Sequence, residues 1–324
     1  MSRSWKRFSQ ARGARLGLAL LGGLIALALL ADLAASDLPL AARVGAHLYL
    51  LPCVTRPAAL ASDDNQSLAA RLGPHDWLLA PPVPYGPYAQ HPGGITRVLD
   101  PPSHRHLLGT DDRGRDVAAR LIHGTRIALA VGPLAVAIYL LLGTLIGLLC
   151  ALGRTGDLVL GRAIEIGLTF PTLFLLLAIQ GMSATASLFE VGLAIALTEW
   201  PQLARLVRAD ALKTMASPHV EAARAMGASP VRVALVHVLP LASSAALTTA
   251  AFGVGQAVLF ETALTFLGFG VPPPLASWGE LLSQAQASGL EPWLLVPPTV
   301  AIALTVIACN LVGDGVRKML EEPG

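Results

Sequence analysis

The sequence predicts an all-α integral membrane protein with six transmembrane helices and an extracytoplasmic insert between the first two. Hydrophobic residues make up 54% of the chain and charged residues only 14%, and the mean hydropathy is +0.61. This balance lies outside the usual range of soluble proteins. Several apolar runs are long enough to cross a bilayer. The formal net charge of +2 and the dispersed arginines argue against nucleic-acid binding.

The N-terminal region, residues 1–35, is predicted to be a short cytoplasmic segment followed by a first span. Five basic residues precede an uncharged run at 16–31. A secretory signal peptide would share this pattern. We favour a retained span, because the positions of the later spans then agree with an N-terminus inside the cell.

Residues 36–124 are predicted to form the extracytoplasmic insert and an interfacial helix. The insert is rich in proline and lacks a helical stripe, and the alternation at 44–50 favours a short strand. The helix at its end has Val117 and Leu121 on an apolar side and Asp116 and Arg120 on a polar one. The fold of residues 36–107 stays open.

Residues 125–314 are predicted to form the transmembrane core, and residues 315–324 a cytoplasmic tail. The five further spans are expected at 127–152, from about 160, at 191–206, at 241–260 and at 292–311. Gly143 and Gly147 have the small-residue spacing that permits close helix contact. Phe170-Pro171 predicts a kink in the third span.

Acidic and aromatic side chains at the spans are candidates for the translocation path or for structural roles. Glu165 follows Arg162 by one turn, which favours an ion pair. Glu199 would cost about 2.5 kcal/mol or more if it faced lipid, so it is expected to face protein or a wet cavity. Glu261 is expected to close the fifth span. Trp278 is expected in a rigid loop at the outer interface, followed by a polar stretch at 283–290.

A charged stretch at 216–241 lies between two apolar runs and is predicted to fold in water. Ser217-Pro218 and Ser229-Pro230 each place a hydroxyl N-cap before a proline at the first helical position. Gly227 suits a left-handed residue after a helix end. Two short helices joined by a tight bend are therefore expected.

Residues of this stretch resemble the EAA loop in the membrane subunits of bacterial ABC importers: Glu221, Ala222, Ala223, Gly227, His237, Leu239 and Pro240. In that family the loop is a pair of coupling helices seated in a groove of the cytoplasmic ATPase. The resemblance implies an ATPase-coupling role for these residues, with Ala222 and Ala223 forming a thin wall that the partner approaches. An ordinary helix-turn-helix is the alternative for the triplet alone. Leu241 replaces the asparagine that the family has after the loop proline.

Three further blocks resemble the oligopeptide and dipeptide permeases of this family. Residues 106–126 match L-G-T-D-x-x-G-R-D-V-x-x-R-x-x-x-G-x-R, residues 261–279 match E-x-x-L-S-F-L-G-L-G-x-x-P-P-x-P-S-W-G with Thr265 for serine, and residues 310–317 match N-L-x-G-D-x-x-R. The resemblance covers 108–317 and points to the C-type subunit. It implies the type I ABC importer permease fold.

The insert is similar to the enlarged outer segment of Yej-type permeases, which import oligopeptides and microcin C. This implies an oligopeptide importer that works by alternating access; a dipeptide, nickel or glutathione type is the alternative. The family also implies partners: a second homologous permease, cytoplasmic ABC ATPase subunits and an extracytoplasmic solute-binding protein. The complex would lie in the bacterial inner membrane, where its spans contact lipid. Both termini are then cytoplasmic.

Other classes of function find less support in the sequence. An ion-coupled secondary carrier would use Glu165 and Glu199, but such carriers are built from repeats and the sequence has none. An intramembrane enzyme lacks an H-E-x-x-H motif, and His104 and His106 are read as surface histidines. Because there is no P-loop, ATP must be bound by another polypeptide. We expect no catalytic residues, no cofactor and no metal, and we assign the aspartates of 111–116 to caps and salt bridges.

Overall fold

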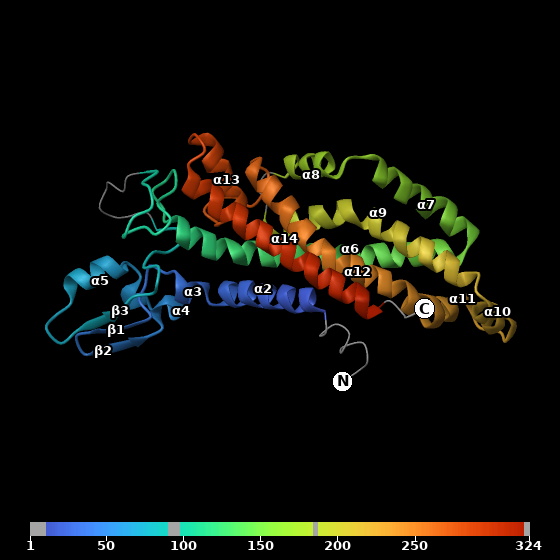
Figure 1. Cartoon of the computed structure of the whole chain (residues 1–324), viewed down its shortest axis with the longest axis horizontal. Helices are drawn as coiled ribbons and strands as arrows, with labels where there is room; N and C mark the ends of the chain where they lie inside the picture. The colour runs from blue at the N-terminus through green and yellow to red at the C-terminus, as the bar shows by residue number, and fades with distance from the viewer. Residues whose placement is uncertain (1–10, 90–97, 184–186, 321–324) are drawn as a thin grey trace. The chain divides into compact units, whose positions relative to one another are not determined.

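The computed structural model describes residues 11–89, 98–183 and 187–320 (Figure 1). The chain forms two compact units, each assembled from separate parts of the sequence. Unit 1 contains residues 1–21, 131–261 and 304–324, and unit 2 contains residues 22–130 and 262–303.

Unit 1 consists of helices and short connections in its described part. Four long helices contribute one portion each, namely α2 (Arg12–Leu29), α6 (Val117–Leu152), α12 (Leu239–Phe266) and α14 (Pro292–Leu320). The others are α7 (Arg154–Thr169), α8 (Thr172–Gly181), α9 (Leu188–Met215), α10 (Pro218–Ala225), α11 (Pro230–Val233) and the π-helical turn η2 (Ala234–Val238). A buried apolar cluster joins α6, α9, α10, α11 and α12.

Two glycines of α6 permit close approach to α9, as their spacing predicts. A Cβ atom on Gly147 would lie 2.8 Å from the Ala204 carbonyl oxygen and 2.8 Å from Val207. A Cβ atom on Gly143 would lie 2.9 Å from the Leu203 side chain. The two backbones can therefore pack at this distance only without side chains at these positions.

Unit 2 contains a small mixed domain within the insert. Its elements are α3 (Ala31–Ala34), β1 (Ala41–Val44), β2 (His47–Leu50), α4 (Pro52–Thr55), η1 (Ala58–Leu60), α5 (Asn65–Arg71) and β3 (Trp77–Leu79), and α13 (Trp278–Ala287) belongs to the same unit. The strands form an antiparallel sheet in the order β2-β1-β3. Leu38, Cys53, Leu60 and Leu68 form its apolar core.

The sheet supplies the fold of the insert, which the sequence left open, and adds β-structure to a chain predicted to be all-α. Residues 44–50 are also not one strand, since Gly45 has a φ of +61° and turns the chain between β1 and β2. Ala42 of β1 is fully buried, and Asp64 and Ser67 form a capping box at the start of α5. The insert thus has a fold and an apolar core of its own.

The structure adds to or corrects three further expectations from the sequence. The expected interfacial helix is the first part of α6, which is one helix from Val117 to Leu152. The expected polar stretch at 283–290 largely belongs to α13. Glu261 does not close a helix, because α12 continues to Phe266 and buries Glu261 completely.

The described helices only partly match the six predicted spans. Four are long and apolar enough to cross a membrane, namely α2, the run Pro230–Phe266, α6 and α14. The pair α7 and α8 passes the same test together and bends by 90° at Phe170-Pro171, where the kink is predicted. The predicted fourth span lies in the 28-residue α9, which is too charged to pass the test.

The substitution Gly147→Ala tests the close contact between α6 and α9. It is expected to lower the free energy of unfolding by about 1–3 kcal/mol, because the new methyl group overlaps Ala204 and Val207. Thermal unfolding in detergent, followed by size-exclusion chromatography, measures the effect. Gly23→Ala is the matched control, since Gly23 lies within α2 with no atom near its added Cβ. Equal unfolding midpoints for both variants would contradict the packing described here.

Candidate functional site

The EAA segment, residues 216–241, forms a short helix, a tight bend and the start of a long helix. Gly227 has a φ of +87° and follows the C-cap Met226, as predicted. The Ala228 N–H donates to the Ala223 carbonyl and the Gly227 N–H donates to the Arg224 carbonyl. This pair of bonds is a Schellman motif, which terminates α10 sharply.

Buried side chains hold the EAA segment against the rest of unit 1. Val220 of α10 and Val233 of α11 are fully buried, in one cluster with Val207 and Ala211 of α9 and Ala242 of α12. Ala223 is only 5% exposed. The expectation that Ala223 forms an open wall for a partner is therefore wrong, because this alanine packs within the chain.

The opposite side of the EAA segment is exposed. Glu221, Ala222 and Gly227 are all accessible, and Met226 is 83% exposed. Val231, at the start of the next helix, is also exposed. An apolar surface next to a carboxylate is thus presented at the bend.

Two details of the EAA segment differ from prediction. Ser217 occupies the N-cap position but its hydroxyl donates back to the Thr214 carbonyl, whereas the Ser229 hydroxyl accepts from the Arg232 N–H at 3.3 Å. The second helix is not short, since α11 and η2 lead without interruption into α12. Within this continuous helix, His237 is half-buried in the π-helical turn, and Pro240 is exposed in the first turn of α12.

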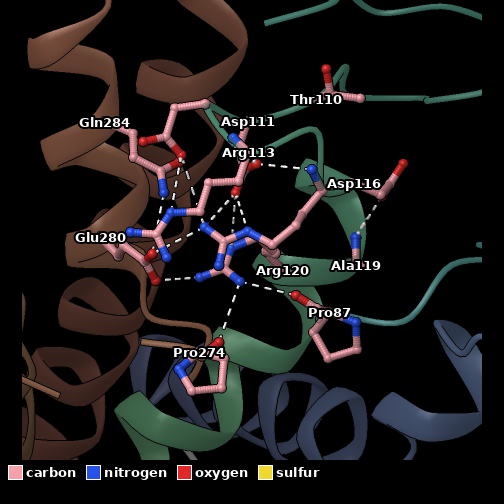
Figure 2. A network of polar contacts seen from close by, with 12 residues as sticks. Pro87, Thr110, Asp111, Arg113, Asp116, Ala119, Arg120, Pro274, Glu280 and Gln284 are labelled. Carbon is pink, nitrogen blue, oxygen red and sulfur yellow. Dashed lines mark hydrogen bonds and ion pairs between the residues drawn. The ribbon is translucent and has the colours of Figure 1, made fainter. Parts of the chain in front are cut away.

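A buried ion network organises unit 2 (Figure 2). Arg115 donates from Nε to Asp111 at 2.7 Å and from Nη2 to Glu280 at 3.0 Å. Arg120, which is fully buried, pairs with the other Glu280 oxygen and donates to the Pro87 carbonyl at 2.9 Å. Two guanidinium groups and two carboxylates therefore join α6 to α13.

The remaining polar groups of the 106–126 block are also used in structure. The His106 Nδ1 and an Asp116 oxygen are 2.8 Å apart, and Tyr85 stacks on His106 with centroids 4.5 Å apart. His106 is buried, so the reading of it as a surface histidine is wrong. Asp116 also accepts from the Ala119 N–H at 2.8 Å. The predicted caps and salt bridges are confirmed, and the described residues contain no three-ligand metal cluster.

Trp278 is a buried structural residue of unit 2. It is 1% exposed at the start of α13, and its indole N–H donates to the Leu121 carbonyl at 3.0 Å. A Cβ atom on Gly124 would lie 2.7 Å from the indole ring. The expectation of an indole in an interfacial loop is therefore wrong.

A cavity of about 400 Å³ lies within unit 1 between α6, α8, α9, α12 and α14. Glu199 lines it, as the prediction of a wet cavity requires, and a hydroxyl–carboxylate hydrogen bond joins it to Thr172. The lining does not include Glu165, which is exposed and paired with Arg162 at 2.7 Å. The ion-pair reading of Glu165 is confirmed.

Three functional features were not identified from the sequence. Glu280 directly follows the S-W-G motif, and a search for partners of the two arginines in the 106–126 block would have pointed to it. Met226 is a large apolar residue next to the bend glycine, which signals an exposed contact. The amide side chains that join Glu199 in the cavity come from three helices, and no sequence spacing connects them.

Replacing Glu280 with glutamine tests the buried network. The change leaves the two buried arginines with one carboxylate, and a broken buried ion pair costs about 3–5 kcal/mol. A loss of that size in thermal stability is expected for the purified protein. The control is Glu165→Gln, whose exposed pair with Arg162 is expected to contribute at most about 1 kcal/mol. Similar stability of the two variants would be inconsistent with an essential network.

Comparison with known proteins places these features in a family. The family described as "Binding-protein-dependent transport system inner membrane component" matches residues 143–322. A Brucella suis protein named as a peptide transport system permease protein is 38% identical over 226 residues, 69% of this chain and 75% of the relative. A second Brucella suis protein, named as a peptide permease protein, is 34% identical over 283 residues, 84% of this chain and 93% of the relative.

Other matches extend the comparison to a further relative and to the fold. The glutathione transport system permease protein GsiD of Pectobacterium atrosepticum is 34% identical over 227 residues, 69% of this chain and 75% of the relative. An inward-facing structure of the MetNI methionine ABC transporter aligns with a TM-score of 0.54 at 18% identity, covering 63% of this chain and 97% of that one. This structural likeness identifies the type I permease fold. The chain belongs to the inner membrane components of binding-protein-dependent transport systems, the permease subunits of ABC importers.

Proposed function

We propose that this chain is the permease subunit of an ABC importer that moves oligopeptides across the inner membrane by alternating access. The observation that carries the proposal is the EAA segment, which is held from inside by Val220 and Val233 and presents Glu221, Ala222 and Met226 outwards. The relatives named for peptide permeases support the cargo. The chain itself performs no chemistry.

We propose that the six spans are α2, α6, the bent pair α7–α8, α9, α12 and α14, with the insert outside and both termini in the cytoplasm. A Cβ atom on Gly17 would lie 2.8 Å from Leu311, so the start of α2 packs near the end of α14. This contact supports a retained first span and the proposal that α2 begins on the side of the membrane where α14 ends. Arg317 also lines a second cavity of unit 1, of about 360 Å³, with Leu206 and Ser244, which supports the same side for the EAA segment.

The division of the chain follows from this topology. Residues 1–35 would supply the cytoplasmic start and the first span, and residues 36–124 the outer insert with the beginning of α6. Residues 125–314 would supply the core with its coupling residues, and residues 315–324 the tail. The helix α14 continues to Leu320, so most of that tail is helical.

The mechanism depends on how force enters the helices. Because α10 and α11 share one buried cluster with α9 and α12, a displacement of the EAA segment must move those two helices as well. Glu221, Ala222, Ala223, Gly227, His237 and Pro240 are assigned to this coupling, with Ala223 acting from its buried position. ATP shifts such an equilibrium only by its unequal affinity for the two states of the complex.

The cargo class and the partners are proposed from the insert and from the named relatives. On the resemblance of the insert to the outer segment of Yej-type permeases, we extend the proposal to that type and to cargo such as microcin C. The relative named for glutathione transport keeps the dipeptide, nickel or glutathione type as the alternative. An ion-coupled secondary carrier finds no support in the family. The proposed partners are a second homologous permease, two cytoplasmic ATPase subunits and an extracytoplasmic solute-binding protein.

Replacing Met226 with glutamate tests the contact with the ATPase. Met226 packs on little of its own chain, so the change is expected to leave folding intact and to weaken ATPase co-purification about tenfold by placing a charge in an apolar contact. Quantitative pull-down of the complex measures the effect. The control is Met182→Glu, an 88% exposed methionine after α8. Equal recovery of ATPase with both variants would argue against this docking surface.

Uptake by the reconstituted complex tests the function itself. Proteoliposomes that contain the complex and its binding protein are expected to accumulate labelled oligopeptide only when ATP is present on the side of the membrane where the ATPases lie. Gly227→Pro is expected to abolish uptake while membrane insertion persists, because proline cannot adopt the φ of +87° found there. Uptake driven by a proton gradient without ATP would refute an ABC importer.

A further inference from the structure

The cavity in unit 1 contains one ionisable acid and no basic side chain. Glu199 is its only charged lining residue, and no lysine, arginine or histidine within the described residues lies at ion-pair distance from it. Its hydrogen bond comes from Thr172, a neutral hydroxyl. The carboxylate therefore faces the cavity without a protein counter-ion.

This arrangement differs from that of three other acids of the chain, which have arginine partners. Asp111 and Glu280 each contact two arginines, and Asp157 accepts two bonds from Arg208. A carboxylate withdrawn from water without a cation is costly, and in a membrane segment such groups mark ligand or ion pathways. The missing cation of Glu199 points to a ligand that brings its own positive charge.

The rest of the lining is suited to a peptide. Gln202, Gln256 and Asn310 contribute amide side chains, which both donate and accept hydrogen bonds as a peptide backbone does. Phe252 and Phe260 contribute apolar surface for side chains of varied shape. A cavity of about 400 Å³ has room for one or two amino-acid residues of a cargo chain.

The backbone of α12 is adapted to this cavity. Gly253 lines it, and a Cβ atom at this position would overlap the hydroxyl of Tyr139. Tyr139 itself lines the cavity, is 4% exposed and lies within electrostatic range of Glu199. The glycine thus lets a phenol oxygen from α6 share the cavity with the carboxylate, which adds a further polar group.

We propose that this cavity is a transit subsite for a primary ammonium group of the cargo, with Glu199 as its anionic partner. The inference rests on the proposed function, because it specifies which part of a peptide the permease recognises. The carboxylate binds the ammonium, and the amides of Gln202, Gln256 and Asn310 bind the adjoining peptide groups. Glutathione, the cargo named for one relative, also carries such a group.

The test uses the complete membrane complex, purified with its partner permease and ATPase subunits but without the binding protein. Isothermal titration calorimetry with trialanine and N-acetyl-trialanine compares cargo with and without the ammonium. The wild-type complex is expected to bind trialanine about tenfold more tightly than the acetylated form. In Glu199→Gln both peptides are expected to bind with the weaker affinity. In the control Glu165→Gln the difference is expected to persist.

A third peptide distinguishes the two sources of the ammonium. N-acetyl-Ala-Lys-Ala carries it only on a side chain, so tight binding assigns the subsite to any primary ammonium, and weak binding assigns it to the peptide N-terminus. Equal affinity of the wild type for trialanine and its acetylated form would overturn the inference, as would an affinity difference that persists in Glu199→Gln or no binding of either peptide. If the Glu199→Gln complex fails to assemble, the affinities of the wild-type complex for trialanine and N-acetyl-trialanine still test whether the ammonium is recognised. ATP-driven uptake of peptide together with equal affinities would remove the subsite and leave the proposed function intact.

Discussion

The rest of unit 1 depends on the apolar contact beneath α10. Val220 and Val233 are buried in the same cluster as Val207 of α9 and Ala242 of α12, so a helix of eight residues is attached on one side to two long helices. Its other side stays free because the Schellman motif at Gly227 ends the helix before it can continue along the cluster. A close-packed interior resists compression, so force applied to the free side reaches α9 and α12 with little loss.

Unit 2 differs from unit 1 in that a network of charged side chains is buried within it. Arg115 and Arg120 lie in the interior with Asp111 and Glu280, and each guanidinium meets carboxylate oxygens from both acids. Such a network adds little net stability over apolar packing, but it tolerates no missing member. Together with the Trp278 indole on the Leu121 carbonyl, it fixes one relative position for the start of α6 and for α13.

Features that depend on local backbone conformation could be predicted from the sequence. The side chains that the tertiary structure brings together could not. Gly227, the close packing at Gly143 and Gly147, and the break at Phe170-Pro171 follow from backbone rules, and the structure agrees. Spacing alone could not tell which alanine of the EAA triplet faces inwards, since this depends on the direction in which α10 lies against α9. It likewise could not assign Trp278 to the interior or Glu280 to the arginines, because those contacts join residues more than 150 positions apart in the chain.

One helix carries both the cavity and the attachment of the EAA segment. Glu199 and Ala211 lie 12 residues apart in α9, which corresponds to about 18 Å along the helix axis. Pro201 follows Glu199 by two positions within the same helix, and proline removes one backbone hydrogen bond of the preceding turn. Pro201 therefore weakens the backbone of α9 beside its cavity carboxylate, and the helix packs on both sides of this point in the cluster that also contains Val220. In the proposed mechanism, a displacement that enters at Val220 reaches this part of α9, so movement of the EAA segment and binding of the cargo ammonium meet at Glu199.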